Sequence, residues 1–135
     1  YEAQLCRREE FFGVCAPQHR LAGRAVPLDE LAGERLILRE SGSGTRAIFE
    51  EALHRQSWTL RSFPNVVTIS DFSTIKSLTA DGLGVSFLYA PVVAQELKDG
   101  TLARFDLAEV PMSGAFYFVC LKDNLFAKAW LDWMQ

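Results

Sequence analysis

The chain has 135 residues, of which 49% are hydrophobic and 23% are charged, and its formal net charge is −3 at pH 7. These values are typical of one globular domain, and the length suffices to bury a core without disulfides or a metal. The slightly acidic balance excludes the basic surface of a nucleic-acid-binding domain, so this chain by itself is not expected to hold DNA.

The cysteines and the apolar runs restrict where the protein works. Cys6, Cys15 and Cys120 form no C-x-x-C pair and have no histidine at metal-ligand spacing, so neither a metal nor a cofactor is predicted. Cys15 and Cys120 lie in apolar runs, where a reduced thiol behaves as a small hydrophobe. Because no apolar run reaches about 18 residues and no signal peptide is present, we expect a cytoplasmic location without membrane contact. The first residue is Tyr1 rather than methionine, from which a piece of a longer protein is expected.

The first half of the chain predicts two strands, a single helical turn and a helix. Residues 11–16 form a continuous apolar run that predicts a strand buried on both faces, and a polar connector follows over 17–27. Residues 28–33 suit a single helical turn that ends at glycine. A strand is then predicted at 35–39 and a helix over 45–56.

The second half continues the alternation. We predict a strand at 65–69, a helix that Ser70-Asp71 caps and that ends at Gly82, and a strand at 85–88. A helix follows over 91–100 and a half-exposed edge strand over 102–107.

The C-terminal segment is predicted to contain one more strand and a final helix. Residues 115–120 form a second continuous apolar run, and Asp123 or Asn124 caps a final helix whose apolar stripe includes Trp130 and Trp133. Such a stripe needs a cover, so self-association of the chain is expected. The alternation of strands and helices predicts an α/β fold with a mostly parallel sheet.

The most informative segment is Leu36–Arg46, in which an apolar strand ends in a Gly/Ser turn that opens a helix. The first N–H groups of a helix have no partner within it, and the helix dipole is positive there, so this end attracts anions. The alternative is that Ser43 only caps the helix. Arg39 and Arg46 could add charge to an anion site, but their neighbours Glu40 and Glu50 favour surface ion pairs.

Two further strand ends carry hydroxyl groups that lead into helices. In a parallel sheet the carboxyl ends of the strands lie at one edge, where ligands bind. This edge is therefore predicted to collect the segments 41–45 and 70–73 together with Tyr89. One hydroxyl cap is common, whereas three at one edge favour a ligand site.

Three motifs in order then resemble the effector-binding domain of LysR-type transcriptional regulators. The motifs are Phe12-x-x-Cys15-Ala16-Pro17-x-His19-x-Leu21-Ala22, Leu28-x-x-Leu31-Ala32-Gly33-x-x-Leu36-Ile37-Leu38-Arg39-Glu40-Ser41-Gly42-Ser43-Gly44-Thr45-Arg46, and Ile75-Lys76-x-Leu78-x-x-Asp81-Gly82-Leu83-Gly84-Val85-x-Phe87-Leu88. The resemblance implies a two-lobed fold like that of type 2 periplasmic binding proteins. It divides the chain into a crossing strand at 1–16, the second lobe at 17–112, and a returning strand and helix at 113–135.

The resemblance also implies a small effector bound between the lobes. Hydroxyl groups at helix N-termini suit a carboxylate or another oxyanion. The expected ligand-binding residues are Ser41, Ser43, Thr45, Ser70, Ser73, Thr74, Ser77 and Tyr89. A homo-oligomer is implied, with DNA held only by a winged helix that precedes this domain in the family.

Two other classes of protein compete with this interpretation. An enzyme needs a nucleophile with a base, paired carboxylates or a metal set, and none is evident. His19 and His54 are expected to be solvated, and no lysine follows the glycines as a phosphate-binding loop requires. A solute-binding protein of a transporter shares the chemistry of the cleft, and the ordered motifs favour the regulator over it.

Overall fold

The computed structural model describes residues 5–109 and 116–121, with side chains described for residues 10–109. The expected final helix, with Trp130 and Trp133, lies outside the described residues, as do the side chains of Cys6 and Cys120. The expected strand at 115–120 is confirmed by its backbone, which is extended over Phe116–Leu121.

The described elements follow the predicted alternation of strands and helices. They are β1 Leu5–Cys15, β2 Ala25–Val26, α1 Leu28–Leu31, β3 Leu36–Leu38, α2 Gly44–Arg55, the 3-10 turn η1 Leu60–Ser62, β4 Val66–Thr68, α3 Phe72–Ala80, β5 Ser86–Tyr89, α4 Ala90–Asp99, β6 Ala103–Leu107 and β7 Phe116–Leu121. The sequence did not predict β2 or η1, and β1 begins at Leu5 rather than at residue 11. β2, η1 and residues 5–10 of β1 lack the apolar periodicity on which the prediction of strands and helices from sequence depends.

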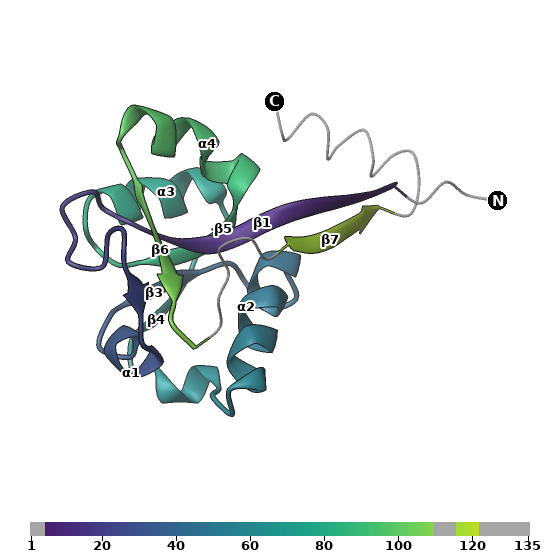
Figure 1. Ribbon diagram of the computed structural model, residues 1–135, viewed down its shortest axis with the longest axis horizontal. Helices are drawn as coiled ribbons and strands as arrows, with labels where there is room; N and C mark the ends of the chain where they lie inside the picture. Colours follow the sequence, from purple (N-terminus) through teal and green to yellow (C-terminus); the bar gives the residue numbers. More distant parts are fainter. Residues whose placement is uncertain (1–4, 110–115, 122–135) are drawn as a thin grey trace.

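The long strand β1 lies at the centre of the sheet and is antiparallel to each of the described strands with which it pairs. It lies antiparallel to β5, with Phe11 opposite Tyr89, and antiparallel to β6, with Gly13 opposite Phe105. Its N-terminal half extends past β5 and β6 and pairs antiparallel with β7 (Figure 1). The expected mostly parallel sheet is therefore wrong, because β1 lies reversed between strands that share one direction. Crossover rules describe consecutive β-α-β units and do not place such a strand.

The parallel strands β4, β3 and β5 are neighbours on one side of β1. β3 pairs in parallel with β4, and Ile37 N–H donates to Val85 O at 2.8 Å just before β5 begins. This approach needs Gly84, since a Cβ there would stand 2.7 Å from the carbonyl oxygen of Arg35. On the other side of β1, β6 is not an edge strand as expected, because β2 pairs along its outer side.

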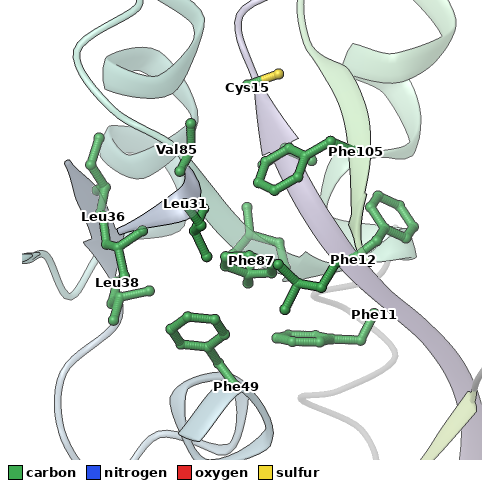
Figure 2. Close-up of a cluster of buried hydrophobic side chains, with 14 of the residues drawn as sticks. Phe11, Phe12, Cys15, Leu31, Leu36, Leu38, Phe49, Val85, Phe87 and Phe105 are labelled. Carbon is green, nitrogen blue, oxygen red and sulfur yellow. The ribbon is translucent and has the colours of Figure 1, made fainter. Parts of the chain in front are cut away.

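Phenylalanine rings from four elements form the centre of the core (Figure 2). Phe87 of β5 stacks on Phe49 of α2 with ring centroids 4.3 Å apart, and it meets Phe105 of β6 edge-on at 5.4 Å. Phe11 of β1 meets the ring of Tyr89 edge-on at 5.5 Å. The core therefore fixes the ring of Tyr89 at the end of β5.

Helices cover the sheet on both sides, with α3 and α4 on one side of β1 and α2 on the other (Figure 1). A buried hydroxyl pair attaches α3 to β5, since Thr79 Oγ1 lies 3.0 Å from Ser86 Oγ and donates to Ile75 O at 2.7 Å. Within residues 5–109 and 116–121, no helix has the length and apolarity needed to cross a membrane.

Candidate functional site at the carboxyl ends of three strands

The carboxyl ends of β3, β4 and β5 lie at one edge of the sheet, as the sequence predicted. β3 and β4 are in parallel register from Leu36 opposite Val66 to Leu38 opposite Thr68. Just beyond them, Ile69 N–H donates to Leu38 O at 2.8 Å, so the segments that leave both strands remain side by side. Ligands of open α/β sheets bind beyond such ends.

The N-terminus of α2 faces this edge with its first turn free of acidic side chains. Ser43 is the N-cap, as one interpretation of the sequence held, and its Oγ accepts from Arg46 N–H at 3.2 Å. Gly42 allows the turn, because its φ of 94° lies in the left-handed region. Only part of the N–H set of the first turn is satisfied by the cap, so this helix end suits an anion.

Ser43 and Thr45 at the start of α2 and Tyr89 at the end of β5 are called the Ser43 cluster below. The Tyr89 oxygen lies 3.7 Å from the point that a Cβ on Gly44 would occupy, so the end of β5 reaches the first residue of α2. Burial raises the pKa of Tyr89 to about 12, which keeps its hydroxyl neutral. Thr45 is buried, and no described residue bonds to its hydroxyl. These groups can donate to an oxyanion without opposing it by a full charge.

The N-terminus of α3 differs, because a carboxylate already occupies it. Asp71 accepts hydrogen bonds from Thr74 N–H at 2.8 Å and from Thr74 Oγ1 at 2.6 Å. The hydrogen bond from the Thr74 hydroxyl is the largest of the causes that hold the pKa of Asp71 below its ordinary value. Thr74 is therefore committed to Asp71, while Ser70 and Ser41 are exposed beside the edge.

Ser73 and Ser77 lie apart from the Ser43 cluster. They line a hollow of about 310 Å³ between α3 and the C-terminal part of α4, together with Lys76, Glu96 and Thr101. Lys76 and Glu96 form an ion pair across this hollow at 3.0 Å. The structure thus brings Ser43, Thr45 and Tyr89 together and puts these two serines on the α4 side of α3.

Two arginines lie at the strand ends, and one of them, Arg46, holds these ends together, a role that the sequence did not indicate. The predicted pairs are present, with Arg39 Nε 3.2 Å from Glu40 Oε1 and Arg46 Nε 3.0 Å from Glu50 Oε2. Arg46 Nη1 also donates to Arg39 O at 3.1 Å and to Thr68 Oγ1 at 3.4 Å. Arg46 therefore joins α2 to the ends of both β3 and β4. Its spacing from Glu50 indicated the pair, but contacts to distant backbone carry no sequence signal.

The described residues contain no catalytic arrangement. His19 is not solvated as expected, because its Nε2 lies 3.0 Å from Glu34 Oε1 and its Nδ1 accepts from Leu21 N–H at 3.1 Å. Burial, with a smaller contribution from Glu34, raises the pKa of Cys15 to about 11, so this buried thiol stays protonated. Among the described residues, no three His, Cys, Asp or Glu side chains are placed to hold a metal ion.

Comparison with known proteins gives a consistent picture. A family model described as the LysR substrate binding domain matches residues 1–135. The chain is 33% identical to the HTH-type transcriptional regulator CfxR of Cupriavidus necator, covering 86% of this chain and 36% of that protein. It is 32% identical to the HTH-type transcriptional activator CmpR of Synechocystis, covering 90% of this chain and 40% of that protein. These relatives are transcriptional regulators and not enzymes, and the chain spans two fifths of their length or less.

Solved structures with the same fold include two ligand complexes. The CcmR regulatory domain of Synechocystis PCC6803, in complex with 2-PG, has a TM-score of 0.66 and 23% identity, with 98% of this chain and 66% of that chain covered. The effector binding domain of QuiR, in complex with shikimate, has a TM-score of 0.62 and 17% identity, with 94% and 60% covered. At these identities the likeness establishes the fold.

Proposed function

The chain belongs to the LysR substrate-binding domain family, and we propose from this premise that it binds a small anionic effector at the carboxyl ends of β3, β4 and β5. Binding there controls DNA binding by a winged helix elsewhere in the full-length regulator. Membership of this family favours a regulator over the solute-binding protein of a transporter. The chemistry of the cleft alone does not distinguish these two classes of protein.

One observation carries the proposal, namely that the uncapped donors of α2 meet neutral hydroxyl groups from two elements. The Tyr89 hydroxyl lies near Gly44, which stands between Ser43 and Thr45 at the start of α2, and the first turn of α2 has no carboxylate that would repel an anion. An anion bound by backbone N–H groups and hydroxyls gains charge-assisted hydrogen bonds in a partly buried place. In the proposal Ser41, Ser70 and Thr74 border this site, whereas Ser73 and Ser77, on the α4 side of α3, take part only if the ligand extends along that helix.

The neighbouring structures support a small polar effector. One holds 2-PG and the other holds shikimate, which carries a carboxylate. Those ligands belong to those proteins, and for this chain they define a class of compound to try rather than an identity. A carboxylate or phosphate is the chemistry that the N-terminus of α2 favours.

We further propose the arrangement of the whole regulator. Residues 17–112 form the second lobe, while 1–16 and 113–135 contain the crossing strands and a helix that returns to the first lobe. The pairing of β7 with the part of β1 that extends past β5 and β6 supports this division (Figure 1). The full-length protein then works in the cytoplasm as a homo-oligomer, with the effector held between the two lobes.

The experiment is a thermal-shift screen of the intact effector domain against small carboxylates and phosphates, including 2-PG and shikimate. A ligand that binds only the folded state raises the melting temperature. Thr45→Val and Tyr89→Phe remove a hydroxyl at nearly constant shape, and we expect both to reduce that shift. Ser62→Ala, which removes an exposed hydroxyl on η1, is the matched control. The site is refuted if no compound raises the melting temperature and if full-length regulators that carry Ser43→Ala or Thr45→Val are still induced like wild type.

The serines beside α4 have their own control. Ser77→Ala removes a hydroxyl from the hollow between α3 and α4 without touching α2. A loss of ligand response in this variant places the effector against α3, whereas an unchanged response limits the site to the end of the sheet.

A further inference from the structure

Arg39 lies between the end of β3 and the start of α3, in a position fixed by an aromatic ring. Its guanidinium carbon stands 4.3 Å from the ring centroid of Phe72, the first residue of α3, and its side chain is 19% exposed. A guanidinium over an aromatic face is held by attraction to the ring quadrupole. The side chain therefore costs little further conformational entropy when it binds a ligand.

The two arginines of this edge differ in what their terminal nitrogens do. Arg46 uses Nη1 for Arg39 O and Thr68 Oγ1 and uses Nε for Glu50. Arg39 uses Nε for Glu40, and no described residue accepts from its Nη1 or Nη2. Arg46 is thus occupied by the protein, whereas Arg39 keeps the two terminal nitrogens with which a guanidinium binds carboxylate or phosphate.

The acidic groups near Arg39 leave room for a ligand. Glu40 is the partner of Nε, but its side chain is 48% exposed, and an exposed pair of this kind is weak and screened by salt. The charge of Arg39 also helps to lower the pKa of Asp71, yet the Asp71 carboxylate accepts its hydrogen bonds from Thr74 at the start of α3. An oxyanion of the ligand can therefore compete for Arg39 at the same edge that carries Ser43 and Thr45.

Resting on the effector site proposed above, we propose that Arg39 supplies the positive charge that binds the oxyanion of the effector through Nη1 and Nη2. Arg46 is a positioning residue that keeps the ends of β3 and β4 together. Arg39 makes the site selective for anions over neutral compounds of the same shape, a discrimination that hydroxyl groups alone do not provide.

The test uses inorganic phosphate as the probe, titrated into the intact effector domain at low ionic strength, where exposed charges are least screened. Binding is followed by the melting temperature and by the Nε–Hε NMR signal of Arg39. Wild type is expected to show a saturable response. Arg39→Met is expected to weaken phosphate binding on the order of tenfold or more, and Arg39→Lys is expected to recover part of it.

Glu40→Gln is the decisive variant, because it predicts a gain. Removing this carboxylate takes away both a competitor for the guanidinium and a repelling charge, so phosphate should bind several-fold more tightly. Glu50→Gln makes the same change beside Arg46 and should leave phosphate binding unchanged. A residue with only a structural role would not produce this contrast.

The outcomes separate this inference from the proposed function. The role of Arg39 is overturned if wild type shows no saturable response. It is also overturned if wild type, Arg39→Met and Glu40→Gln bind phosphate with equal affinity. If Thr45→Val still weakens binding of an effector from the screen while Arg39→Met does not, the proposed site remains and Arg39 is only a surface ion-pair residue. If neither variant has an effect, both proposals are wrong.

Discussion

Gly13→Ala is expected to destabilise the domain, because the central strand has no room for a single methyl group at this position. Gly13 lies in β1 directly opposite Phe105 of β6. A Cβ at residue 13 would stand 2.4, 2.6 and 2.7 Å from three ring carbons of Phe105, whereas ordinary contact begins at 3.4 Å. The ring would have to withdraw by about 1 Å to relieve the overlap.

The surroundings of Phe105 oppose that movement. The ring is 1% exposed and meets Phe87 edge-on at 5.4 Å, so it presses against the centre of the core (Figure 2). Overpacking of this kind costs about 1–3 kcal/mol, and the lower entropy of the unfolded alanine chain offsets about 0.4–1 kcal/mol of it. We therefore expect a net loss of about 1–2 kcal/mol in the free energy of unfolding.

The assay is urea unfolding followed by far-UV circular dichroism, with Gly33→Ala as the control. A Cβ at Gly33 would meet its nearest atom, the Glu30 carbonyl oxygen, at 3.5 Å, which is ordinary contact. Gly33→Ala should therefore be neutral or slightly stabilising. Phe105→Leu in the Gly13→Ala background should recover stability relative to the sum of the two single changes. Equal midpoints for Gly13→Ala and Gly33→Ala would refute the reasoning.

Three further changes test other parts of the fold. Thr79→Val leaves the buried Ser86 hydroxyl without its partner and should cost about 1–3 kcal/mol in urea unfolding, much of which Ser86→Ala should restore in the double variant. Ser57→Gly should raise the free energy of unfolding by about 1 kcal/mol, because Ser57 holds a left-handed φ of 62°, and no gain would contradict that geometry. Asp71 has a lowered folded-state pKa, so its stabilisation is present above the unfolded value and is lost as pH falls through the folded value. Asp71→Asn keeps the cap without the charge and should flatten the fall in stability as the pH drops below about 4, the ordinary range of an aspartate, and an unchanged slope would count against the Asp71 shift.

The chain order of the elements was predictable because local rules control it. Ser43 and Asp71 cap their helices as predicted, and Gly100 ends α4 in the left-handed conformation. The convergence of the ends of β3, β4 and β5 was also predictable, since parallel strands share an edge. By contrast, the polar N-terminal half of β1 and the two-residue β2 depend on partners that lie far away in the chain.

The candidate site also has some features that the sequence predicted and others that it did not. The hydroxyl groups of Ser43 and Thr45 follow a strand in a recognisable turn, so the sequence alone located them. The sequence also indicated that Arg39 and Arg46 have acidic neighbours, but it made the two residues equivalent. Their difference arises only when β4 brings Thr68 to Arg46 and α3 brings Phe72 to Arg39.

The sequence by itself determined the family, the alternation of strands and helices, and the hydroxyl-rich turn before α2, because these depend on residue order and spacing. Tertiary structure alone decided the direction of β1, the separation of Ser73 and Ser77 from the Ser43 cluster, and the contrast between the two arginines. The physical reason is that side-chain partners from distant segments carry no local signal, so packing of the sheet selects which donors remain available to a ligand.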